Sequence, residues 1–542
     1  MHFSGAPGTA GIRLGGYAPC TRTTTARDFA ASAPRALRMA AAAAAAAALM
    51  CACGGESVTA QAAAAPAGSI DSLGATGWAS HGTPTTGGQG AAAERTYTVA
   101  NRNELIQALY GNTAVIAPDG SVQGTPDKAP KVIRIRGTID LNVDGQLRPY
   151  TPDRYVAGSC ASSVHGYASQ ASLWSDYLAA YRPGAWGNAR TVSGKPEDAR
   201  ACAAELQRRV VTISVPDNTS LLGIGTDAKI LHGNLMLGTP DAPVANIVIR
   251  NITFEDAFDD FPQWDPTDSS DGRWNSEYDL ISVAHASHVW IDHNTFSDGD
   301  RHDHAFPSVW HETVHGTDYS GGDFKVQHHD GLVDVTRHGN YVTLSNNHFH
   351  DHDKAFLIGG TDVPGADSGN PRMLKVTFHG NHFQNLRQRQ ARVRYGMVHL
   401  YNNYYENTRD ASADYPWLAG MTLGQSGKVH AENNVVSLAG PDRPARPADV
   451  ANARISAART QDCAALFSAS ECASTFYDSG TVLNGGPADL TAAVRWSSAL
   501  AAAPAWKPSD FYDYTLEDTA DLAARITARA GAGKLEGPAE PR

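Results

Sequence analysis

The chain lacks an excess of basic residues, and it lacks an apolar run long enough to span a membrane. It has 44 Lys and Arg against 56 Asp and Glu, for a net charge of -12, and its pI is near 5.9. We do not expect a globally acidic protein to bind nucleic acid or heparin. If its substrate is an anion, the attraction must come from a local basic patch or a bound cation.

The N-terminus joins a basic segment to a short apolar run. Residues 1–38 hold five Arg and one Asp, and residues 39–50 are almost all Ala. That run is too short for a stable transmembrane helix, but the pattern is typical of a secretory signal. The Ala-Cys-Gly-Gly at residues 52–55 resembles a lipoprotein processing site with Cys53 as the lipidated residue. A simple cleaved signal is the alternative.

We therefore predict a secreted or extracytoplasmic protein, either free or lipid-anchored at Cys53. Its signal region is 1–53. Residues 54–94 are rich in Ala, Gly, Ser and Thr, which predicts a flexible linker, with order beginning near Tyr97. The remaining residues, 95–542, are predicted to form one domain.

Cysteine is scarce, with seven in 542 residues. Three lie in or near the signal region, and the others make two local pairs, Cys160 with Cys202 and Cys463 with Cys472. In an exported protein we expect disulfides. Three connectivities of these four cysteines are open, and buried free thiols are the alternative.

A repeated pattern runs through the middle of the chain. Six segments read as a short strand, an Asn turn and an apolar or aromatic residue: 247–254, 289–296, 342–349, 376–383, 398–405 and 429–436. Repeats of this kind indicate stacked coils that bury their apolar faces against their neighbours. Residues 131–141, 209–215 and 219–225 also look like strands. Residues 170–208, 487–502 and 517–530 look helical, and we expect the last two to cover the final coil.

Acidic residues recur at the ends of neighbouring strands. Asp279 precedes one predicted strand, and Asp330 and Asp334 flank the start of the next. Oxygen ligands from several segments suit Ca²⁺, so we predict a calcium site. Each Asp taken alone is more simply explained as a solvated loop residue.

An arginine cluster follows at residues 387–394. Strand alternation places Arg392 and Arg394 on one face and Arg389 on the other, unless a turn at Gln390-Ala391 intervenes. We expect an anion, here the substrate's carboxylates, to hold these cations together.

Histidines are concentrated between His285 and His399, where sixteen of the 21 lie. A zinc site at His302, Asp303 and His304 is one interpretation. The chain has neither HExxH nor a Cys/His quartet, and several histidines take equivalent coil positions. Stacking is therefore the simpler role.

These motifs resemble the pectate lyases of polysaccharide lyase family 1 between residues 95 and 440. The likeness rests on VWIDHNTF (289–296), QHHDGLVDVT (327–336), HDHDKAFLIG (350–359) and RQRQARVRYGMVHLYNNYYEN (387–407).

The resemblance implies an all-β fold, a single-stranded right-handed parallel β-helix with long loops and short capping helices. It also implies Ca²⁺-dependent β-elimination of α-1,4-linked polygalacturonate, giving 4,5-unsaturated products. The family's roles fall here on Arg389 as base, on Lys354 and Arg394 as substrate-binding residues, and on Asp279, Asp330 and Asp334 as metal ligands, with Glu277 as a further candidate.

One position departs from the family pattern R-x-P-R-x-R, because Ala391 replaces the proline. Proline would fix the backbone that aims the base, so the substitution bears on rate. The reference pKa of arginine lies above 12, so an arginine base predicts an alkaline pH optimum.

Three alternatives remain at this stage: a pectin lyase acting without Ca²⁺, a β-helix polygalacturonase, and a non-catalytic glycan-binding solenoid. The polymer is the only partner expected, and a monomer is the default.

Overall fold

The computed structural model describes residues 69–72, 74–365, 367–497, 500 and 506–536. The chain divides into two compact units, residues 1–64 and 65–542, and every described residue belongs to the second. The predicted signal region and Cys53 therefore lie outside the described residues. None of the helices in the described part has the length and hydropathy needed to cross a bilayer.

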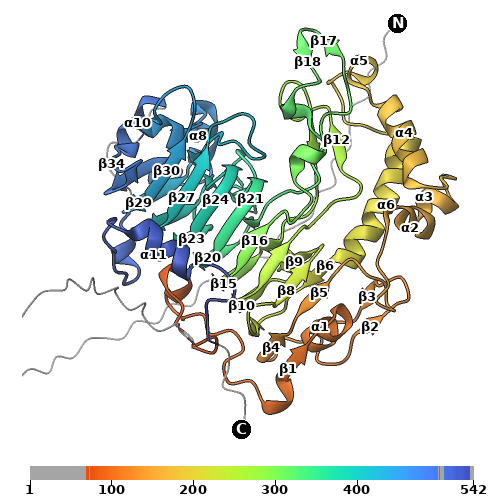
Figure 1. Ribbon diagram of the computed structural model, residues 1–542, viewed down its shortest axis with the longest axis horizontal. Helices are drawn as coiled ribbons and strands as arrows, with labels where there is room; N and C mark the ends of the chain where they lie inside the picture. Colours follow the sequence, from red (N-terminus) through yellow and green to blue (C-terminus); the bar gives the residue numbers. More distant parts are fainter. Residues whose placement is uncertain (1–68, 73, 366, 498–499, 501–505, 537–542) are drawn as a thin grey trace, which may run out of the picture. The chain divides into compact units, whose positions relative to one another are not determined.

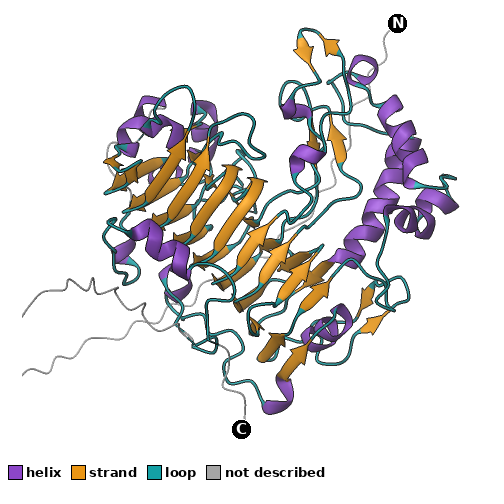
Figure 2. Cartoon of the chain, in the orientation of Figure 1, coloured by secondary structure: helices purple, strands orange, loops and turns teal. Residues whose placement is uncertain are grey.

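Three parallel sheets form the body of this unit, and successive coils add one strand to each (Figures 1 and 2). Sheet I has ten strands in this order: β1 Thr96–Val99, β4 Lys131–Ile135, β7 Thr219–Gly223, β10 Val244–Arg250, β15 Ala286–Asp292, β20 Asn340–Ser345, β23 Lys375–His379, β26 Met397–Tyr401, β29 Lys428–Glu432 and β32 Thr475–Ser479.

Sheet II also has ten strands: β5 Thr138–Asp140, β8 Lys229–Leu231, β11 Thr253–Glu255, β16 Thr295–Ser297, β21 His348–Lys354, β24 His382–Gln388, β27 Tyr404–Thr408, β30 Val435–Ala439, β33 Val482–Leu483 and β34 Gly486–Pro487. Only the last pair, β33 with β34, is antiparallel.

Sheet III has eight strands: β6 Thr212–Ser214, β9 Asn234–Leu237, β14 Ile281–Ala284, β19 Val333–Thr336, β22 Leu357–Ile358, β25 Arg392–Val393, β28 Met421–Leu423 and β31 Ala451–Ala453. Together the three sheets make the predicted right-handed parallel β-helix.

The repeated segments cross from sheet I to sheet II, as their pattern predicts. Asn294, Asn347, Asn381, Asn403 and Asn434 form a buried ladder, in which each Asn after the first accepts from the Asn of the preceding coil. The aromatic residue that follows turns inward, so that Phe254, Phe296, Phe349 and Phe383 stack in line. The ladder gives hydrogen-bond partners to polar groups that would otherwise be buried without one, which explains why Asn recurs at the turn.

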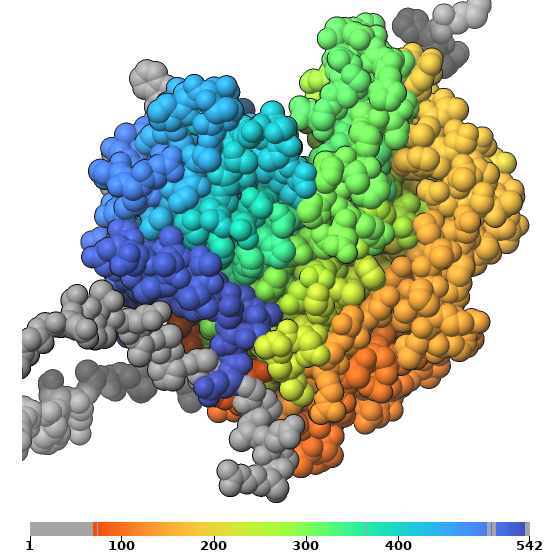
Figure 3. All heavy atoms as spheres, in the orientation of Figure 1, coloured from red at the N-terminus to blue at the C-terminus, as the bar shows by residue number. Residues whose placement is uncertain are grey.

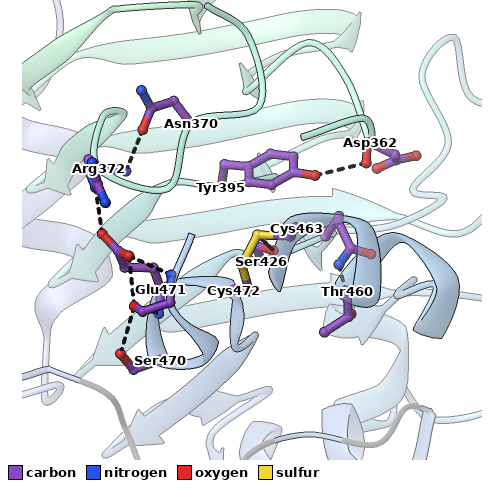
Figure 4. The surroundings of a disulfide bond; sticks show 12 residues. Asp362, Asn370, Arg372, Tyr395, Ser426, Thr460, Cys463, Ser470, Glu471 and Cys472 are labelled. Atoms are coloured by element: carbon purple, nitrogen blue, oxygen red, sulfur yellow. Dashed lines mark hydrogen bonds and ion pairs between the residues drawn. A yellow bond between two sulfur atoms is a disulfide. The ribbon is translucent and has the colours of Figure 1, made fainter. Parts of the chain in front are cut away.

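Helices cover the flank and the far end of the stack. They are α1 Arg102–Leu109, α2 Pro152–Gly158, α3 Cys160–Ser163, α4 Gln170–Ala180, α5 Pro183–Trp186, α6 Lys195–Val211, α7 Pro447–Val450, α8 Ala457–Ala464, α9 Ala469–Cys472, α10 Leu490–Ser497 and α11 Leu522–Arg529. The predicted disulfides are present: Cys160–Cys202 joins α3 to α6, and Cys463–Cys472 joins α8 to α9 (Figure 4).

Long loops and two small hairpins lie in the connections from sheet II to sheet III. A third small hairpin lies between the first two strands of sheet I. The hairpins are β2 Val115–Ile116 with β3 Val122–Gln123, β12 Gln263–Asp265 with β13 Arg273–Asn275, and β17 Thr313–Val314 with β18 Thr317–Asp318. An aromatic core that includes Trp264, Trp274 and Trp310 packs the last two hairpins against α4. We call the two loops that carry these hairpins, residues 256–275 and 298–328, the tower.

The prediction of a flexible linker at 54–94 is wrong for its described part. Residues 76–88 lie along sheet I, where the backbone amides of Trp78, Ala79 and Gly88 donate to side chains of β23, β20 and β7. Trp78 is fully buried. A composition rich in small residues suits a flexible chain, but it also suits a segment that packs closely against a sheet.

The prediction that both C-terminal helices cover the last coil is half right. Helix α10 packs on β31 and β32. Helix α11 instead packs on Tyr404 of sheet II, and the chain then returns along earlier coils, where Gly533 donates to Asn251 and Ile70 donates to Glu536.

Candidate active site

Two buried carboxylates meet where the coils of β14 and β19 lie side by side. Asp334 pairs with Ser282 in the sheet register, and Asp279 lies two residues before β14. Asp279 accepts from Ser282 Oγ at 2.5 Å and from the Gly331 amide at 3.0 Å. Asp334 accepts from the Leu357 amide at 2.9 Å. Backbone and hydroxyl donors therefore fix both side chains.

Gly331 leaves the space into which these carboxylates point. A Cβ atom at this position would lie 2.6 Å from Asp334 Oδ1 and 2.7 Å from Asp279 Oδ1. Only glycine allows the two oxygens to come so close to the backbone.

Asp330 completes the acidic group, and Lys354 faces it. Lys354 Nζ donates to Asp330 Oδ1 at 2.7 Å, and Asp279, Asp330 and Asp334 all line one cavity of about 430 Å³. The three carboxylates are not among the groups of described residues whose ligand atoms all lie within 4.8 Å of one another. Asp330 is instead directed toward Lys354.

Without a bound cation, the carboxylates of this group repel one another. Burial and the neighbouring Asp330 raise the pKa of Asp279, and burial with Asp279 raises the pKa of Asp334 well above its usual range. Burial also acts to raise the pKa of Asp330, but Lys354 and Arg389 outweigh it and lower that pKa. Oxygen-only donors from adjacent coils, crowded around a glycine, fit Ca²⁺, which takes several oxygens in flexible geometry.

The arginine cluster adopts the turn that strand alternation required. Strand β24 ends at Gln388, Arg389 has φ of 62°, and β25 begins at Arg392. Ala391 is buried inside the turn. Arg389 acts electrostatically on Asp330 and Asp334, so the turn brings it to the carboxylates. Its Nε is buried and has no hydrogen-bond partner within the described residues.

Arg394 lies just beyond β25 on the same side of the stack. Its Nε is 2.8 Å from Asp362 Oδ1, and its guanidinium donates to Gly359 O at 3.2 Å. Burial lowers the pKa of Arg394, with Asp362 opposing and Arg389 adding to the shift. Arg394, Arg389 and Lys354 therefore bring three cations to the edge of the carboxylate cavity.

Arg392 belongs to this face and was not among the predicted site residues. It follows Asp334 and Leu357 along one row of sheet III and precedes Thr422. Burial lowers its pKa to about 10, and repulsion by Arg394, Arg389 and Arg454 contributes. Its side chain has no hydrogen bond or ion pair within the described residues. The sequence signal that could have identified Arg392 as a site residue is the strand alternation, which places it on the same face as Arg394.

Glu277 points away from the cavity. Its Oε1 lies 3.7 Å from Arg208 Nε of α6, and it is not among the residues that line the cavity. Burial and Asp259 raise the pKa of Glu277 to about 7. The structure therefore gives this residue a partner on the helical flank.

A buried polar network holds the site from behind. His352 bonds the backbone oxygen of Asp330 at 3.0 Å and Asp298 at 2.5 Å. Lys325 of the tower donates to both Asp303 and Asp353. These contacts fix the backbone around Asp330 and the strand that ends in Lys354, so the acidic group is held from two elements.

Histidines stack along the coils, as predicted. His348, His382 and Tyr404 occupy one row of sheet II with nearly parallel rings. The proposed zinc group of His302, Asp303 and His304 does not form as such, because the Asp303 carboxylate is buried against Lys325 and Gln327.

The site lies beside a hollow in the molecular surface. In the space-filling view, the surface is recessed between the green tower and the cyan surface of the later coils (Figure 3). The coils that hold Lys354 and Arg389 have short connections to sheet III, whereas the tower on one side is long. An extended polymer can therefore approach the cations along the sheet.

Comparison with known proteins finds pectate lyases by family profile, by sequence and by structure. The family profile described as pectate lyase matches residues 186–535. A pectate lyase of Bacillus subtilis (strain 168) is 38% identical over 459 residues, which cover 85% of this chain and 92% of the relative.

Two solved structures are similar along most of the chain. A pectate lyase from Acidovorax avenae subsp. citrulli is 98% identical, with a TM-score of 0.86, covering 90% of this chain and 100% of the other. A pectate lyase bound to a hexasaccharide is 36% identical, with a TM-score of 0.69, covering 86% and 99% respectively.

Proposed function

The chain belongs to the pectate lyase family, and from that premise we propose that it cleaves α-1,4-linked polygalacturonate with Arg389 as base and with Ca²⁺ held by Asp279, Asp330 and Asp334. The observation that carries this proposal is the turn at residues 389–391, which brings Arg389 toward a cavity lined by three carboxylates, with a buried Nε that has no hydrogen-bond partner in the described part of the chain. Glu277 is left out of the proposed ligand set because it faces Arg208.

Calcium, when bound, would neutralise the carboxylate of the attacked uronate and so make the neighbouring C5 proton more acidic. Lys354 and Arg394 add positive charge at the same place and stabilise the negative charge that develops when the proton leaves. Arg389 takes the C5 proton in its neutral form, which the neighbouring cations favour. The electron pair released forms the C4–C5 double bond, the bond to O4 breaks, and the departing O4 takes a proton from water. The new non-reducing end is a 4,5-unsaturated uronate.

Arg392 and Arg454 extend the positive surface beyond the reacting sugar. Arg392 has no anionic partner within hydrogen-bonding distance among the described residues, and Arg454 follows β31, two coils farther along the stack. Successive strands lie about 4.8 Å apart. Arginines on nearby coils are therefore close enough together to contact different sugars of one polymer chain. We therefore assign these arginines to carboxylates of uronates remote from the broken bond.

The decisive experiment is to follow the ultraviolet absorbance of unsaturated uronate on polygalacturonate at alkaline pH, with Ca²⁺ and then with chelator. A rise that requires Ca²⁺ supports the proposal. A rise indifferent to chelator would indicate a pectin lyase mechanism. Reducing ends without absorbance would indicate hydrolysis, and neither signal would leave a glycan-binding protein.

The role of Arg392 is tested by replacing it with methionine, which keeps much of the apolar side-chain volume. We expect KM for long polygalacturonate to rise roughly tenfold, as expected for loss of a charge-assisted contact, with a smaller effect on a trimer. An equal effect on both lengths would place Arg392 at the reacting sugar instead.

The basic and apolar N-terminal pattern also supports action outside the cytoplasm, where a polymer of this size is encountered. Mass spectrometry of the exported protein would distinguish a lipid at Cys53 from simple cleavage. Sedimentation would test the expected monomer.

A further inference from the structure

Three polar side chains from two separate loops meet at the surface between the tower and a later coil. His302 Nδ1 lies 3.1 Å from Asp414 Oδ2, and His304 Nδ1 lies 3.4 Å from Asp414 Oδ1. One ligand atom from each residue lies within 4.8 Å of the other two. We propose that His302, His304 and Asp414 bind a divalent transition metal of the zinc type, separate from the calcium site.

The spacing of the donor atoms is that of metal ligands, although His302 and Asp414 are also close enough for a hydrogen bond. Charge-assisted N–H···O bonds usually measure about 2.7–2.9 Å. In a tetrahedron with metal–ligand bonds of 2.0–2.1 Å, neighbouring donors are about 3.3 Å apart. The two His–Asp distances, 3.1 Å to Asp414 Oδ2 and 3.4 Å to Asp414 Oδ1, lie close to that edge length, and a metal would bind one of the two oxygens.

The donor types select the class of metal. Imidazole nitrogen suits zinc, copper and nickel, whereas Ca²⁺ and Mg²⁺ prefer oxygen alone. Two imidazoles and one carboxylate leave one position of a tetrahedron for water. His304 and Asp414 are exposed and His302 is partly exposed, so solvent reaches that position.

The two loops that carry the ligands are joined before any metal arrives. Tyr415, next to Asp414, donates its hydroxyl to Asp298 at 2.5 Å and accepts from the Asp303 amide at 3.0 Å. Its ring centroid lies 5.4 Å from that of His302. The two loops are therefore already joined beneath the site, so that metal binding need not bring them together and loses conformational entropy mainly in the exposed side chains.

A second group, Asp298 with Asp303 and His329, is also close-packed. Its members are already partnered by Tyr415, Lys325 and Asp256. This buried group supports the surface site from below. Asp303 turns inward, while its neighbours His302 and His304 remain at the surface.

A metal here would tie the tower to the loop between β27 and β28. These loops belong to coils on either side of those that carry Lys354 and Arg389. The bridge would therefore fix one wall of the hollow in which the polymer lies, and we expect it to stabilise the protein rather than take part in the chemistry.

The test uses full-length, tag-free protein saturated with Ca²⁺ and titrated calorimetrically with Zn²⁺. We expect one site, and binding roughly 100-fold weaker or more in His302→Ala/His304→Ala and in Asp414→Asn, because a lost ligand should cost at least as much as a lost supporting residue. The matched control is His311→Ala/His315→Ala, which removes two exposed tower histidines and should bind as the wild type does.

Two further readouts separate binding from a folding defect. Zn²⁺ should raise the Tm of the wild type and the control, but not that of the site variants, whose Tm without Zn²⁺ and Ca²⁺-dependent activity should match the wild type. Co²⁺ in the site should show the intense visible bands of tetrahedral coordination. Equal affinity in all variants, absence of Zn²⁺ binding by the wild type, or the weak spectrum of octahedral Co²⁺ would each overturn the proposal.

Discussion

At the scale of single residues, the site depends on where the backbone departs from regular strand geometry. Arg389 has a positive φ and is placed between β24 and β25, so it is freed from the alternation that governs Arg392 and Arg394. Gly331 supplies the other exception, because its missing Cβ makes room for two carboxylate oxygens. Both exceptions follow from a single residue each, and each can be tested alone.

We predict that Arg389→Ala lowers kcat by about 10²–10⁴-fold, the usual contribution of general base catalysis, with little change in KM. Steady-state kinetics on polygalacturonate at saturating Ca²⁺ would measure this. Arg136→Ala, which removes an equal charge from an exposed position in the first coils, is the control. Near-normal kcat in Arg389→Ala would exclude this residue as the base.

We predict that Gly331→Ala raises the Ca²⁺ concentration for half-maximal activity by roughly 10–100-fold, the range seen when metal ligands lose their support. The new Cβ would displace Asp334 Oδ1 or Asp279 Oδ1. Gly322→Ala is the control, since nothing lies within 4 Å of a Cβ built there. An unchanged Ca²⁺ dependence would mean that these oxygens are not ligands.

At the scale of secondary-structure elements, two lysines lie at the start of strands of sheet I. Lys375, which is half-buried, opens β23, and Lys428, which is buried, opens β29, in one row of the sheet register. Burial lowers the pKa of each to about 8, and for Lys428 the neighbouring Lys375 contributes. An unfolded lysine titrates near 10.4.

The sign of the effect follows from these values. Between pH 8 and about 10.4 the unfolded chain binds more protons than the folded one, so the free energy of unfolding rises with pH in this window. We predict that Lys375→Met/Lys428→Met flattens this rise by on the order of 5 kcal/mol, because each lysine contributes about 1.4 kcal/mol per pKa unit. Urea denaturation across the pH range would measure it.

The exposed Lys507→Met serves as control and should keep the wild-type slope. If the double variant keeps it too, the two lysines are not responsible for the pH dependence.

At the scale of the whole molecule, segments from both ends of the described chain run along the outside of the stack. Trp78 of the N-terminal segment is enclosed by Trp506, Phe511 and Tyr512 of the C-terminal segment and by Tyr341 of β20. Three coils therefore gain lateral support that their own strands do not supply, and a repeat stack otherwise relies on nearest neighbours alone.

We predict that Trp78→Ala lowers the free energy of unfolding by about 3–5 kcal/mol, the usual cost of truncating a buried aromatic residue. Lyase activity well below the Tm should persist, because Trp78 packs on sheet I and the catalytic group lies at sheet III. Leu466→Ala, at a position 60% exposed, is the comparison. A loss within the error of that control would show that the segment is not structural.

The amino-acid sequence alone determined the repeated coil and much of the site. A strand buried on one face and an Asn at every turn are local patterns, so their periodicity specified the stack without knowledge of distant contacts. Because a stack places equivalent positions of adjacent coils side by side, Asp279 and Asp334 could be brought together from their places in neighbouring repeats. The family resemblance added the roles proposed for Arg389, Lys354 and Arg394.

Only the tertiary structure decided which way the irregular segments turn. Glu277 faces Arg208, the small-residue segment packs on sheet I, and Asp414 meets His302 across 112 residues. No periodicity relates such positions, and their contacts depend on where long loops come to rest on the stack. The sequence could therefore predict what the coils repeat, but not what their insertions contact.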